Sequence, residues 1–361
     1  MSAGGVNTRI LKIDPESVDL ELVREAADVI RRGGIVAFPT ETVYGLGADA
    51  YNREAAKKVF VAKGRPMDNP LIVHISYLGQ LYEVASEVPD FVERLAKRFW
   101  PGPLTLVLRK TPRVPPEVTA GRGTVAVRMP AHPVALALIR ESGAPIGAPS
   151  ANLAGRPSPT TGEHVLRDLY GRADVIIDSG ETLYGVESTI VDVTKDPPVL
   201  LRPGAMPLEE VERELGKFVV VPPFARGLGD ADVALAPGTK YRHYAPLKRV
   251  TVVEGDYNDL EAYAKRAATV VRAAVERGSR PIMLCSSETE PIYRENGIRT
   301  IVLGPRTNPF IIARNLFKSL RLIDDLLDVD EAFAEGYEER GLGLAIMNRL
   351  RKASGFCTVR V

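Results

Sequence analysis

Residues 63–75, with the sequence KGRPMDNPLIVHI, indicate both the fold class and the kind of site that this chain carries. The final run LIVHI is short, apolar and rich in β-branched residues, which is typical of a buried strand. In the loop before it, Lys63 and Arg65 stand close to Pro66, and Pro70 ends the loop. Because prolines restrict the backbone, the two cations are held in place. The segment therefore predicts an anion-binding loop beside a sheet.

Two further polar loops follow predicted strands. The segment 39–45 (PTETVYG) comes after a strand at 35–38, and the segment 147–152 (GAPSAN) comes after a strand at 144–146. Open α/β sheets bring such loops together in one crevice, and loops held on a rigid sheet carry function more often than core residues do. We therefore expect the three polar loops to form one site.

Residues 1–221 predict an α/β domain with a twisted mixed sheet and flanking helices, since short β-rich runs alternate with amphipathic stretches. Strands are expected near residues 35, 71, 104, 124, 145, 175, 188 and 199, and helices near residues 21, 53, 89, 133, 163 and 207. Short connections join the strands at 104–108 and 124–128, and those at 188–193 and 199–202. Such connections predict antiparallel pairs.

Residues 222–247 form the predicted linker, because the composition shifts at Pro222 and Pro223 to a loop rich in glycine, proline and alanine. Its motif KYRHYAP is too aromatic and stiff for a plain tether, so we expect a lid. Residues 248–361 predict a smaller Rossmann-like domain with a parallel sheet between helices. Its expected strands are 249–253, 281–285, 299–303 and one near 332, and its expected helices are 258–277, 308–328 and 342–354.

The composition is that of a globular chain long enough for two domains, with 361 residues of which 45% are hydrophobic and 26% charged. The net charge of +1 argues against a polyanion binder, although residues 94–132 are strongly basic and residues 321–340 acidic. Cys285 and Cys357 lack CxxC spacing, so we expect two core thiols. No apolar run approaches the roughly 20 residues of a spanning helix, so we expect a cytoplasmic protein without membrane contact.

Signals for other kinds of site are weak. The chain has no Gly-x-x-x-x-Gly-Lys-Ser/Thr phosphate loop, and GLGADA at 45–50 follows a seven-residue loop where a dinucleotide site needs a tight turn. Ser150 lacks the Gly-x-Ser-x-Gly context of a hydrolase, and the four histidines show no metal-ligand spacing. The Lys, Arg, Ser, Thr and Asn residues at the strand ends fit phosphoryl or nucleotidyl transfer, which depends on charge neutralisation.

Each candidate residue also has a purely structural interpretation. His74 at a strand end is more often a core histidine than a functional one. Arg65 and Arg128 could be solvated or ion-paired at the surface, while Ser150 and Asn152 could cap the next turn or helix. Their occurrence together beside the ends of predicted strands favours a shared site.

Six segments occur in order along the first domain: PTETVYGLGA from Pro39, KGRPMDNPLIVHI from Lys63, PSAN from Pro149, GRPSPTT from Gly155, GVESTIVD from Gly185 and RPG from Arg202. Together they closely resemble the YrdC-like threonylcarbamoyl-AMP synthases. The later segment APGTKYRHYAP from Ala236, followed by another α/β domain, is similar to the two-domain branch of that family. The resemblance covers nearly the full chain.

The resemblance implies a nucleotidyltransferase that forms L-threonylcarbamoyl-adenylate and pyrophosphate from L-threonine, bicarbonate or CO2, and ATP. It implies Mg2+ as a cofactor that binds mainly through the ATP phosphates. The product would pass to the machinery that modifies adenosine in tRNA with a threonylcarbamoyl group.

Motif positions in the family also imply roles for individual residues. The threonine pocket would be lined by Thr42, His74, Arg128 and Ser188, with the Arg128 guanidinium pairing the substrate carboxylate. The catalytic residues would be Lys63 and Arg65, which neutralise charge on the phosphates. The nucleotide would be held by Lys63, Arg65, Asn69, Thr124, Ser150, Asn152, Ser158 and Arg202, and by Tyr241 or His243 of the linker.

Two other functions compete with this one. An RNA-binding module could present residues 94–132 to phosphates, although the balanced net charge argues against it, and an enzyme of this kind could still make a weak RNA contact. A carbamoyltransferase that uses carbamoyl phosphate shares the first domain. Such enzymes carry extra zinc-finger, acylphosphatase-like or kinase-like modules, whereas this chain has no CxxC pair and too few residues.

Overall fold

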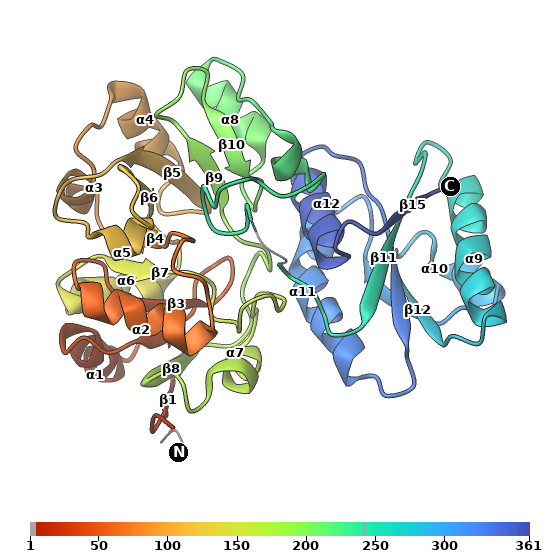
Figure 1. Cartoon of the computed structure of the whole chain (residues 1–361), viewed down its shortest axis with the longest axis horizontal. Coiled ribbons are helices and arrows are strands. Elements are labelled where there is room, and N and C mark those ends of the chain that lie inside the picture. Colours follow the sequence, from red (N-terminus) through yellow and green to blue (C-terminus); the bar gives the residue numbers. More distant parts are fainter. Residues whose placement is uncertain (1–4, 241–242) are drawn as a thin grey trace. The chain divides into compact units, whose positions relative to one another are not determined.

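The structure is a computed structural model that describes residues 5–240 and 243–361. The chain divides into two compact units, and Figure 1 labels most of their elements. The first unit comprises the residues up to 154, residues 158–222 and residues 231–240, and the second comprises residues 155–157, 223–230 and those from 243 on. The segment that the sequence predicts as a linker is thus divided between the two units.

The first unit contains, within the described residues, a ten-stranded mixed sheet with the strand order β1-β8-β2-β3-β7-β4-β6-β5-β9-β10. Its strands are β1 (Arg9–Lys12), β2 (Val36–Phe38), β3 (Gly45–Asp49), β4 (Ile72–His74), β5 (Leu104–Arg109), β6 (Thr124–Arg128), β7 (Ile146–Ala148), β8 (Val175–Asp178), β9 (Thr189–Asp192) and β10 (Val199–Arg202). The predicted antiparallel pairs β5–β6 and β9–β10 are confirmed, as is the mixed character of the sheet.

Helices flank this sheet, as the sequence predicts. They are α1 (Leu20–Arg31), α2 (Arg53–Lys63), α3 (Gly79–Val84), α4 (Asp90–Phe99), α5 (Pro116–Thr119), α6 (Pro133–Ser142), α7 (Gly162–Leu169) and α8 (Leu208–Leu215). Helix α2 begins after Asn52, whose side chain caps two backbone amides, and ends at Gly64 with φ 61° and ψ 35°. This left-handed conformation suits glycine and turns the chain from Lys63 directly into the loop before β4.

Strands β1 and β3 and the short helices α3 and α5 are absent from the sequence-based prediction. Strand β3 is the segment GLGAD, whose glycines have low strand propensity. Its pairing depends on tertiary contact, because a Cβ at Gly47 would lie 2.3 Å from Ile146 Cγ2 and 2.8 Å from Phe38 Cε1. Most of the segment 45–50 is a strand inside the sheet, and it is not a turn between a strand and a helix.

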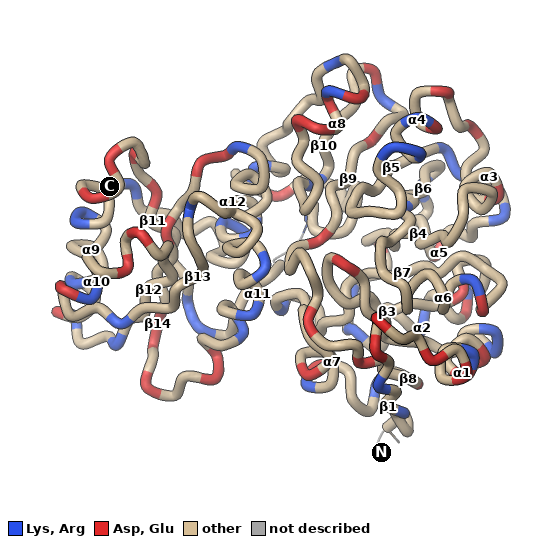
Figure 2. Tube along the Cα trace, turned by 180° about the vertical axis from the view of Figure 1, so that it is seen from behind, with Lys and Arg blue, Asp and Glu red and all other residues tan. Residues whose placement is uncertain are grey.

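The basic stretch 94–132 is less positive in the folded chain than in the sequence. Acidic residues that precede it pair with its cations: Lys97 Nζ lies 2.7 Å from Glu93 Oε1, and Arg113 Nη1 lies 2.7 Å from Glu83 Oε2. Figure 2 shows acidic and basic residues interspersed along the helices of this unit. The positive field that the sequence predicts here is therefore reduced, and with it the case for an RNA-binding surface.

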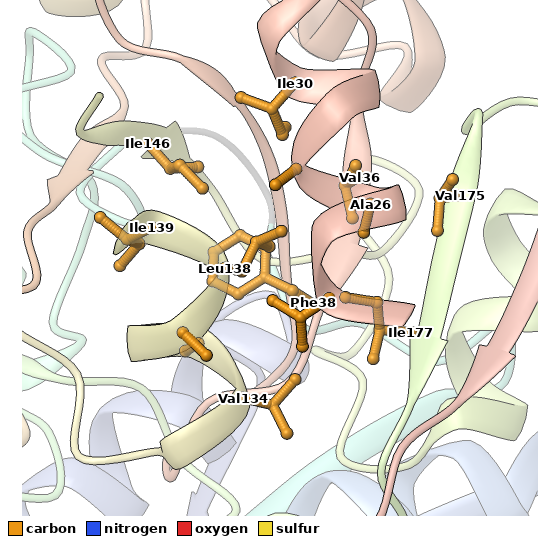
Figure 3. Packing of buried hydrophobic residues seen from close by; sticks show 14 of the residues in the cluster. Ala26, Ile30, Val36, Phe38, Val134, Leu138, Ile139, Ile146, Val175 and Ile177 are labelled. Carbon is orange, nitrogen blue, oxygen red and sulfur yellow. The ribbon is translucent and has the colours of Figure 1, made fainter. Parts of the chain in front are cut away.

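A hydrophobic core of the first unit lies where α1 and α6 pack on the sheet (Figure 3). Helix α1 places apolar residues at helical spacing, among them the buried Val23 and Ile30. Phe38 from β2 and Leu138 from α6 fill the space between these elements. Burying a side chain of this size contributes about 1.5–3 kcal/mol. Because Phe38 ends β2, this core fixes where the loop 39–44 leaves the sheet.

The second unit has a five-stranded parallel sheet in the order β13-β12-β14-β11-β15 among its described residues, as expected for a Rossmann-like domain. Its strands are β11 (Arg249–Glu254), β12 (Pro281–Ser286), β13 (Thr300–Gly304), β14 (Glu331–Glu335) and β15 (Thr358–Arg360). Its helices are α9 (Leu260–Glu276), α10 (Glu290–Glu295), α11 (Pro309–Asp325), α12 (Leu342–Ala353) and the 3-10 turn η1 (Pro223–Arg226). The sequence-based prediction lacks α10 and β15.

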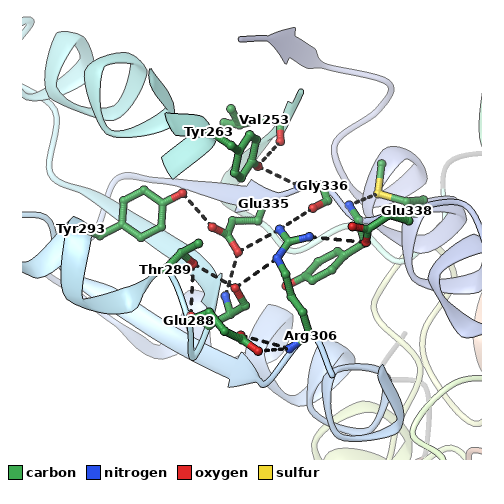
Figure 4. A network of polar contacts seen from close by, with 12 residues as sticks. Val253, Tyr263, Glu288, Thr289, Tyr293, Arg306, Glu335, Gly336 and Glu338 are labelled. Atoms are coloured by element: carbon green, nitrogen blue, oxygen red, sulfur yellow. Dashed lines mark hydrogen bonds and ion pairs between the residues drawn. The ribbon is translucent and has the colours of Figure 1, made fainter. Parts of the chain in front are cut away.

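Arg306 of the second unit lies in a polar network near the carboxyl ends of the strands (Figure 4). Its guanidinium is 3.3 Å from the carboxylate of Glu335, which is completely buried, and Tyr293 OH donates to the same carboxylate at 2.8 Å. The guanidinium also lies 5.0 Å from the ring centre of Tyr257 and 4.5 Å from that of Tyr337. The buried charge is thus paired inside the fold. Sequence patterns do not reveal this network, because its members are far apart in the chain.

The prediction of two core thiols is right for one cysteine only. Cys285 is buried on β12, whereas Cys357 is half-buried just before the edge strand β15. A hydrogen bond from Arg249, 3.5 Å from Sγ, lowers the pKa of the Cys357 thiol, and the Thr251 hydroxyl acts in the same direction. Cys357 is less buried than expected because β15 is an edge strand, which has a neighbouring strand, β11, on one side.

Candidate functional site

The three polar loops meet at the ends of neighbouring central strands of the first sheet, as the sequence predicts. The loop after β2 is joined to the segment after β7, because Leu46 N donates to Pro149 O at 2.9 Å and Ala151 N donates to Tyr44 O at 2.8 Å. The side chain of Lys63, at the end of α2, reaches the same segment. The antiparallel pairing of β3 with β2 and with β7 sets this arrangement.

Lys63 is a buried cation at the centre of this junction. It is 2% exposed, and its ammonium group donates to the carbonyl oxygens of Ser150 and Asn152. Ala154 N donates back to Lys63 O at 2.9 Å. A buried ammonium group is costly unless its protons are satisfied, so these carbonyls fix both the charge and the loop that carries them. The structure thus holds Lys63 where an anionic ligand at this loop would meet it.

Arg65 and Asn69 shape the loop between α2 and β4. Arg65 Nη2 donates to the carbonyls of Asn69 at 3.3 Å and Pro70 at 3.1 Å. Asn69 is 1% exposed, and its Oδ1 has no hydrogen-bond partner among the described residues. The loop is therefore stiffened by its own arginine, as well as by its prolines, and it keeps a buried amide oxygen available to a ligand.

Arg128 forms a buried ion pair with Glu41. Nη2 of Arg128 lies 2.6 Å from Oε1 of Glu41, and the two side chains are 4% and 3% exposed. Nε of Arg128 donates to Gly102 O at 3.3 Å. Arg128 is therefore not a solvated surface arginine. An internal carboxylate occupies the guanidinium that the family resemblance assigns to the carboxylate of threonine.

His74 lies beside Arg128, because the two residues are partners in the parallel pairing of β4 with β6. Its Nδ1 is 3.0 Å from Ile72 O and 3.3 Å from Ile146 O, so Nδ1 carries the proton and Nε2 is left as an acceptor. Burial, and then the charge of Arg128, lower the pKa of His74 to about 3. A neutral histidine in this position can accept a hydrogen bond from a ligand hydroxyl.

This low pKa makes the stability of the first unit depend on pH. The folded pKa of about 3 lies below the 6.5 of an unfolded histidine, so only the unfolded state binds a proton between these values. The contribution of His74 is complete above pH 6.5 and is lost as the pH falls toward 3. Below about pH 5.5 the loss amounts to about 1.4 kcal/mol per pH unit.

We therefore expect His74→Asn to reduce the acid sensitivity of unfolding by about that slope between pH 5.5 and 4.5. Urea unfolding can be followed by the fluorescence of Trp100, which is the one tryptophan of the chain and belongs to the first unit. His132, whose pKa burial lowers to about 4, contributes to the slope in both proteins. Equal slopes for the two proteins would contradict the assignment.

Ser188 and Arg202 lie together at the ends of β9 and β10. Arg202 Nη2 donates to Ser188 O at 3.0 Å and to Ser188 Oγ at 3.2 Å, and the same hydroxyl is 2.8 Å from Thr105 Oγ1. Arg202 Nη1 donates to Pro237 O at 3.2 Å. Pro237 belongs to the segment 231–240 of the first unit. The beginning of the predicted lid therefore contacts a residue that the sequence assigns to nucleotide binding.

Three polar residues of the predicted nucleotide site are fixed by partners inside the first unit. Ser150 Oγ donates to Asn152 Oδ1 at 2.5 Å. Ser158 is fully buried, and its hydroxyl donates to Glu187 Oε1 at 2.6 Å. Their orientations are thus set before any ligand binds, which lowers the entropic cost of binding.

Thr42 and Thr124 complete the predicted set within this unit. The hydroxyl of the buried Thr42 is 2.8 Å from Thr40 Oγ1, so it belongs to the hydrogen-bonded turn after β2. Thr124 begins β6 and Arg128 ends it, so both face the same side of the sheet about 13 Å apart. The structure therefore separates these two residues, which the sequence assigns to different ligands.

The two linker residues are not part of the first unit as described. Tyr241 lies outside the described residues. His243 belongs to the second unit, where its ring centre lies 5.5 Å from that of Tyr244, and Tyr244 in turn lies 5.2 Å from Phe317.

Two buried carboxylates contact residues of the predicted site. Glu41 and Glu187 are 3% and 4% exposed, and each contacts a predicted site residue. The charge of Glu41 also acts on His132 and Tyr184. Burial lowers the pKa of His132 and raises that of Tyr184, and the charge of Glu41 raises the pKa of both side chains. The signal was present in the motifs PTETVYG and GVESTIVD, where an acid follows or precedes a buried strand.

None of the described helices is both long enough and apolar enough to cross a membrane. Within residues 5–240 and 243–361, no three or more His, Cys, Asp or Glu residues are grouped so that they could hold a metal ion.

Family models match both units. A model described as Telomere recombination (Sua5/YciO/YrdC) matches residues 28–204, and a model described as Threonylcarbamoyl-AMP synthase, C-terminal domain, matches residues 206–355.

Similar proteins cover nearly the whole chain. The threonylcarbamoyl-AMP synthase of Pyrococcus abyssi is 51% identical over 96% of this chain and 98% of its own length. That of Bacillus subtilis is 46% identical over 94% of both chains. The crystal structure of P. abyssi Sua5 complexed with L-threonine has a TM-score of 0.89 at 49% identity, covering 98% of this chain and 99% of that one.

Proposed function

The chain belongs to the threonylcarbamoyl-AMP synthase family, and from this membership we infer that it forms L-threonylcarbamoyl-adenylate for the modification of adenosine in tRNA. The reaction consumes L-threonine, bicarbonate or CO2, and ATP, and it releases pyrophosphate. The structural observation that carries the assignment is the meeting of the three polar loops at the buried ammonium group of Lys63. That junction offers fixed positive charge and backbone dipoles where ATP must lose pyrophosphate.

For L-threonine we propose a pocket on the side of β4 and β6 that carries His74 and Arg128. The guanidinium of Arg128 would pair with the carboxylate, and neutral Nε2 of His74 would accept a hydrogen bond from the hydroxyl. Thr42 and Ser188 would border the same ligand. The burial of Arg128, His74 and Ser188 supports this proposal, since buried polar groups give a ligand strong and directional contacts.

For ATP we propose the ends of the central strands, where the three loops meet. Lys63 and Arg65 would neutralise the phosphates, and Asn69 would supply its buried amide. The sugar and base would contact Thr124, Ser150, Asn152, Ser158 and Arg202. Mg2+ would bind mainly through phosphate oxygens and water, as this small cation does in many nucleotide sites.

These assignments define a sequence of steps. The amine of threonine reacts with CO2 or bicarbonate to give a carbamate, and a carbamate oxygen attacks the α-phosphorus of ATP in line. The bond from that phosphorus to the bridging oxygen breaks, and pyrophosphate leaves. The protein contributes positioning and charge neutralisation more than covalent chemistry, as is usual in transfer to phosphorus.

An omission assay tests the function. We expect pyrophosphate release from ATP to require both L-threonine and bicarbonate, and to stop when either is left out. Adenylate formation can be checked by chromatography of the same samples. Binding of RNA that weakens steeply with salt, without any pyrophosphate release, would favour an RNA-binding module instead. Activity with carbamoyl phosphate in place of bicarbonate would point to the carbamoyltransferase.

A further inference from the structure

Glu41 is a buried carboxylate whose hydrogen-bonding capacity is unused. Both of its side-chain oxygens lack a hydrogen-bond partner of normal geometry within the described residues, as does Nη2 of Arg128. The 2.6 Å contact between the two groups is therefore an ion pair without a well-formed hydrogen bond. Buried polar atoms are nearly always hydrogen-bonded in folded proteins, so an exception on this scale needs a reason.

Hydrogen bonds fix the backbone around Glu41. Tyr184 N donates to Glu41 O at 2.9 Å, and the hydroxyl of Thr40 closes the turn by donating to Val43 O at 2.7 Å. The backbone of the loop is thus fixed from both sides, while the carboxylate is left with acceptor sites. Nδ1 of His132 is a further buried atom without a hydrogen bond among the described residues. These buried atoms therefore offer several hydrogen-bonding positions to a polar ligand.

We propose that Glu41 binds the ammonium group of threonine and takes a proton from it. This inference rests on the function proposed above. In the structure Glu41 pairs with Arg128, and threonine would replace that internal pair with two new ones. Its carboxylate would take over the guanidinium of Arg128, and its ammonium group, two bonds away, would meet the released carboxylate of Glu41. The zwitterion thus matches the two charges that already face one another.

The exchange also solves a chemical requirement of the reaction. An ammonium group has no lone pair, so threonine must lose a proton before its nitrogen can attack carbon. Transfer of that proton to Glu41 breaks one N–H bond and forms a carboxylic acid. The amine then attacks the carbon of bicarbonate, the departing hydroxide takes the second N–H proton, and water and the carbamate result. Glu41 therefore retains the single proton that threonine and bicarbonate release together.

The test compares binding with turnover in Glu41→Gln, which keeps the shape of the side chain and removes its charge. We expect the dissociation constant of L-threonine, measured by calorimetry, to stay within about threefold of the wild-type value, because Arg128 is freed for the substrate. We expect the turnover number for pyrophosphate release to fall about 100-fold, since a general base contributes at least that much. Glu41→Asp, which keeps a carboxylate, should retain more turnover than Glu41→Gln.

Glu83→Gln is the matched control. Glu83 also pairs with an arginine of the first unit, but its side chain is a third exposed and it takes no part in the site. We expect wild-type turnover and threonine affinity for this variant. Normal turnover in Glu41→Gln would overturn the inference, as would parallel losses of threonine affinity and turnover in both Glu41 variants. Wild-type protein that releases no pyrophosphate would instead refute the proposed function itself.

Discussion

Replacing Lys63 with alanine should lower threonine-dependent pyrophosphate release by about 100-fold or more. The ammonium group is buried, and it is held by the carbonyls of Ser150 and Asn152 at the point where the polar loops meet. Its removal takes away a fixed charge that acts on the phosphates and also loosens the segment after β7. Steady-state measurement with ATP and threonine both saturating reports the loss in the turnover number.

Lys57→Ala provides the control, because Lys57 lies on the exposed side of the same helix and pairs with Glu54 in a surface salt bridge. This variant should keep its turnover within about twofold, since exposed pairs contribute little. Thermal unfolding of both variants separates a folding defect from a catalytic one. If Lys63→Ala turned over at close to the wild-type rate, Lys63 would be a structural residue of the loop and not part of the reaction.

Local sequence signals predicted the parts of the site that are set by local chemistry. The loop between α2 and β4 can be predicted from two cations and two prolines within a few residues. Gly64 ends the preceding helix in a left-handed conformation. The strands that flank the loops carry β-branched residues and could also be predicted from the sequence. Where the backbone conformation follows from nearby residues, the sequence-based prediction and the structure agree.

Features that depend on distant residues could not be predicted in this way. Strand β3 is rich in glycine, and Gly47 fits between Phe38 and Ile146 of the neighbouring strands because it has no Cβ. In the sequence, Glu41 looks like an ordinary acidic residue of a loop. In the structure, the pairing of strands that are not consecutive in the chain brings Arg128 next to it. The buried charges of a site are therefore harder to predict from sequence than its loops. A buried acid can be identified only when its partner, which is distant in the chain, is known.

The pairing of Arg128 with Glu41 allows the stability of the fold to be separated from substrate binding. Arg128→Gln should destabilise the first unit by about 3–5 kcal/mol, because it leaves Glu41 charged, buried and unpaired. The same variant should weaken L-threonine binding at least 100-fold, since a buried charge pair to the substrate carboxylate is lost. Urea unfolding followed by Trp100 fluorescence measures the first effect, and calorimetry measures the second.

The double variant Arg128→Gln with Glu41→Gln distinguishes the two effects. Two neutral amides of similar shape replace the ion pair, and exchanging both members of a buried pair is often neutral for stability. We therefore expect the double variant to regain all but about 1 kcal/mol of the free energy of unfolding. Threonine binding should remain lost, because neither amide can pair with a carboxylate or an ammonium group as a charge does. Recovery of binding together with stability would mean that Arg128 serves the fold alone, and that the carboxylate of threonine is held elsewhere.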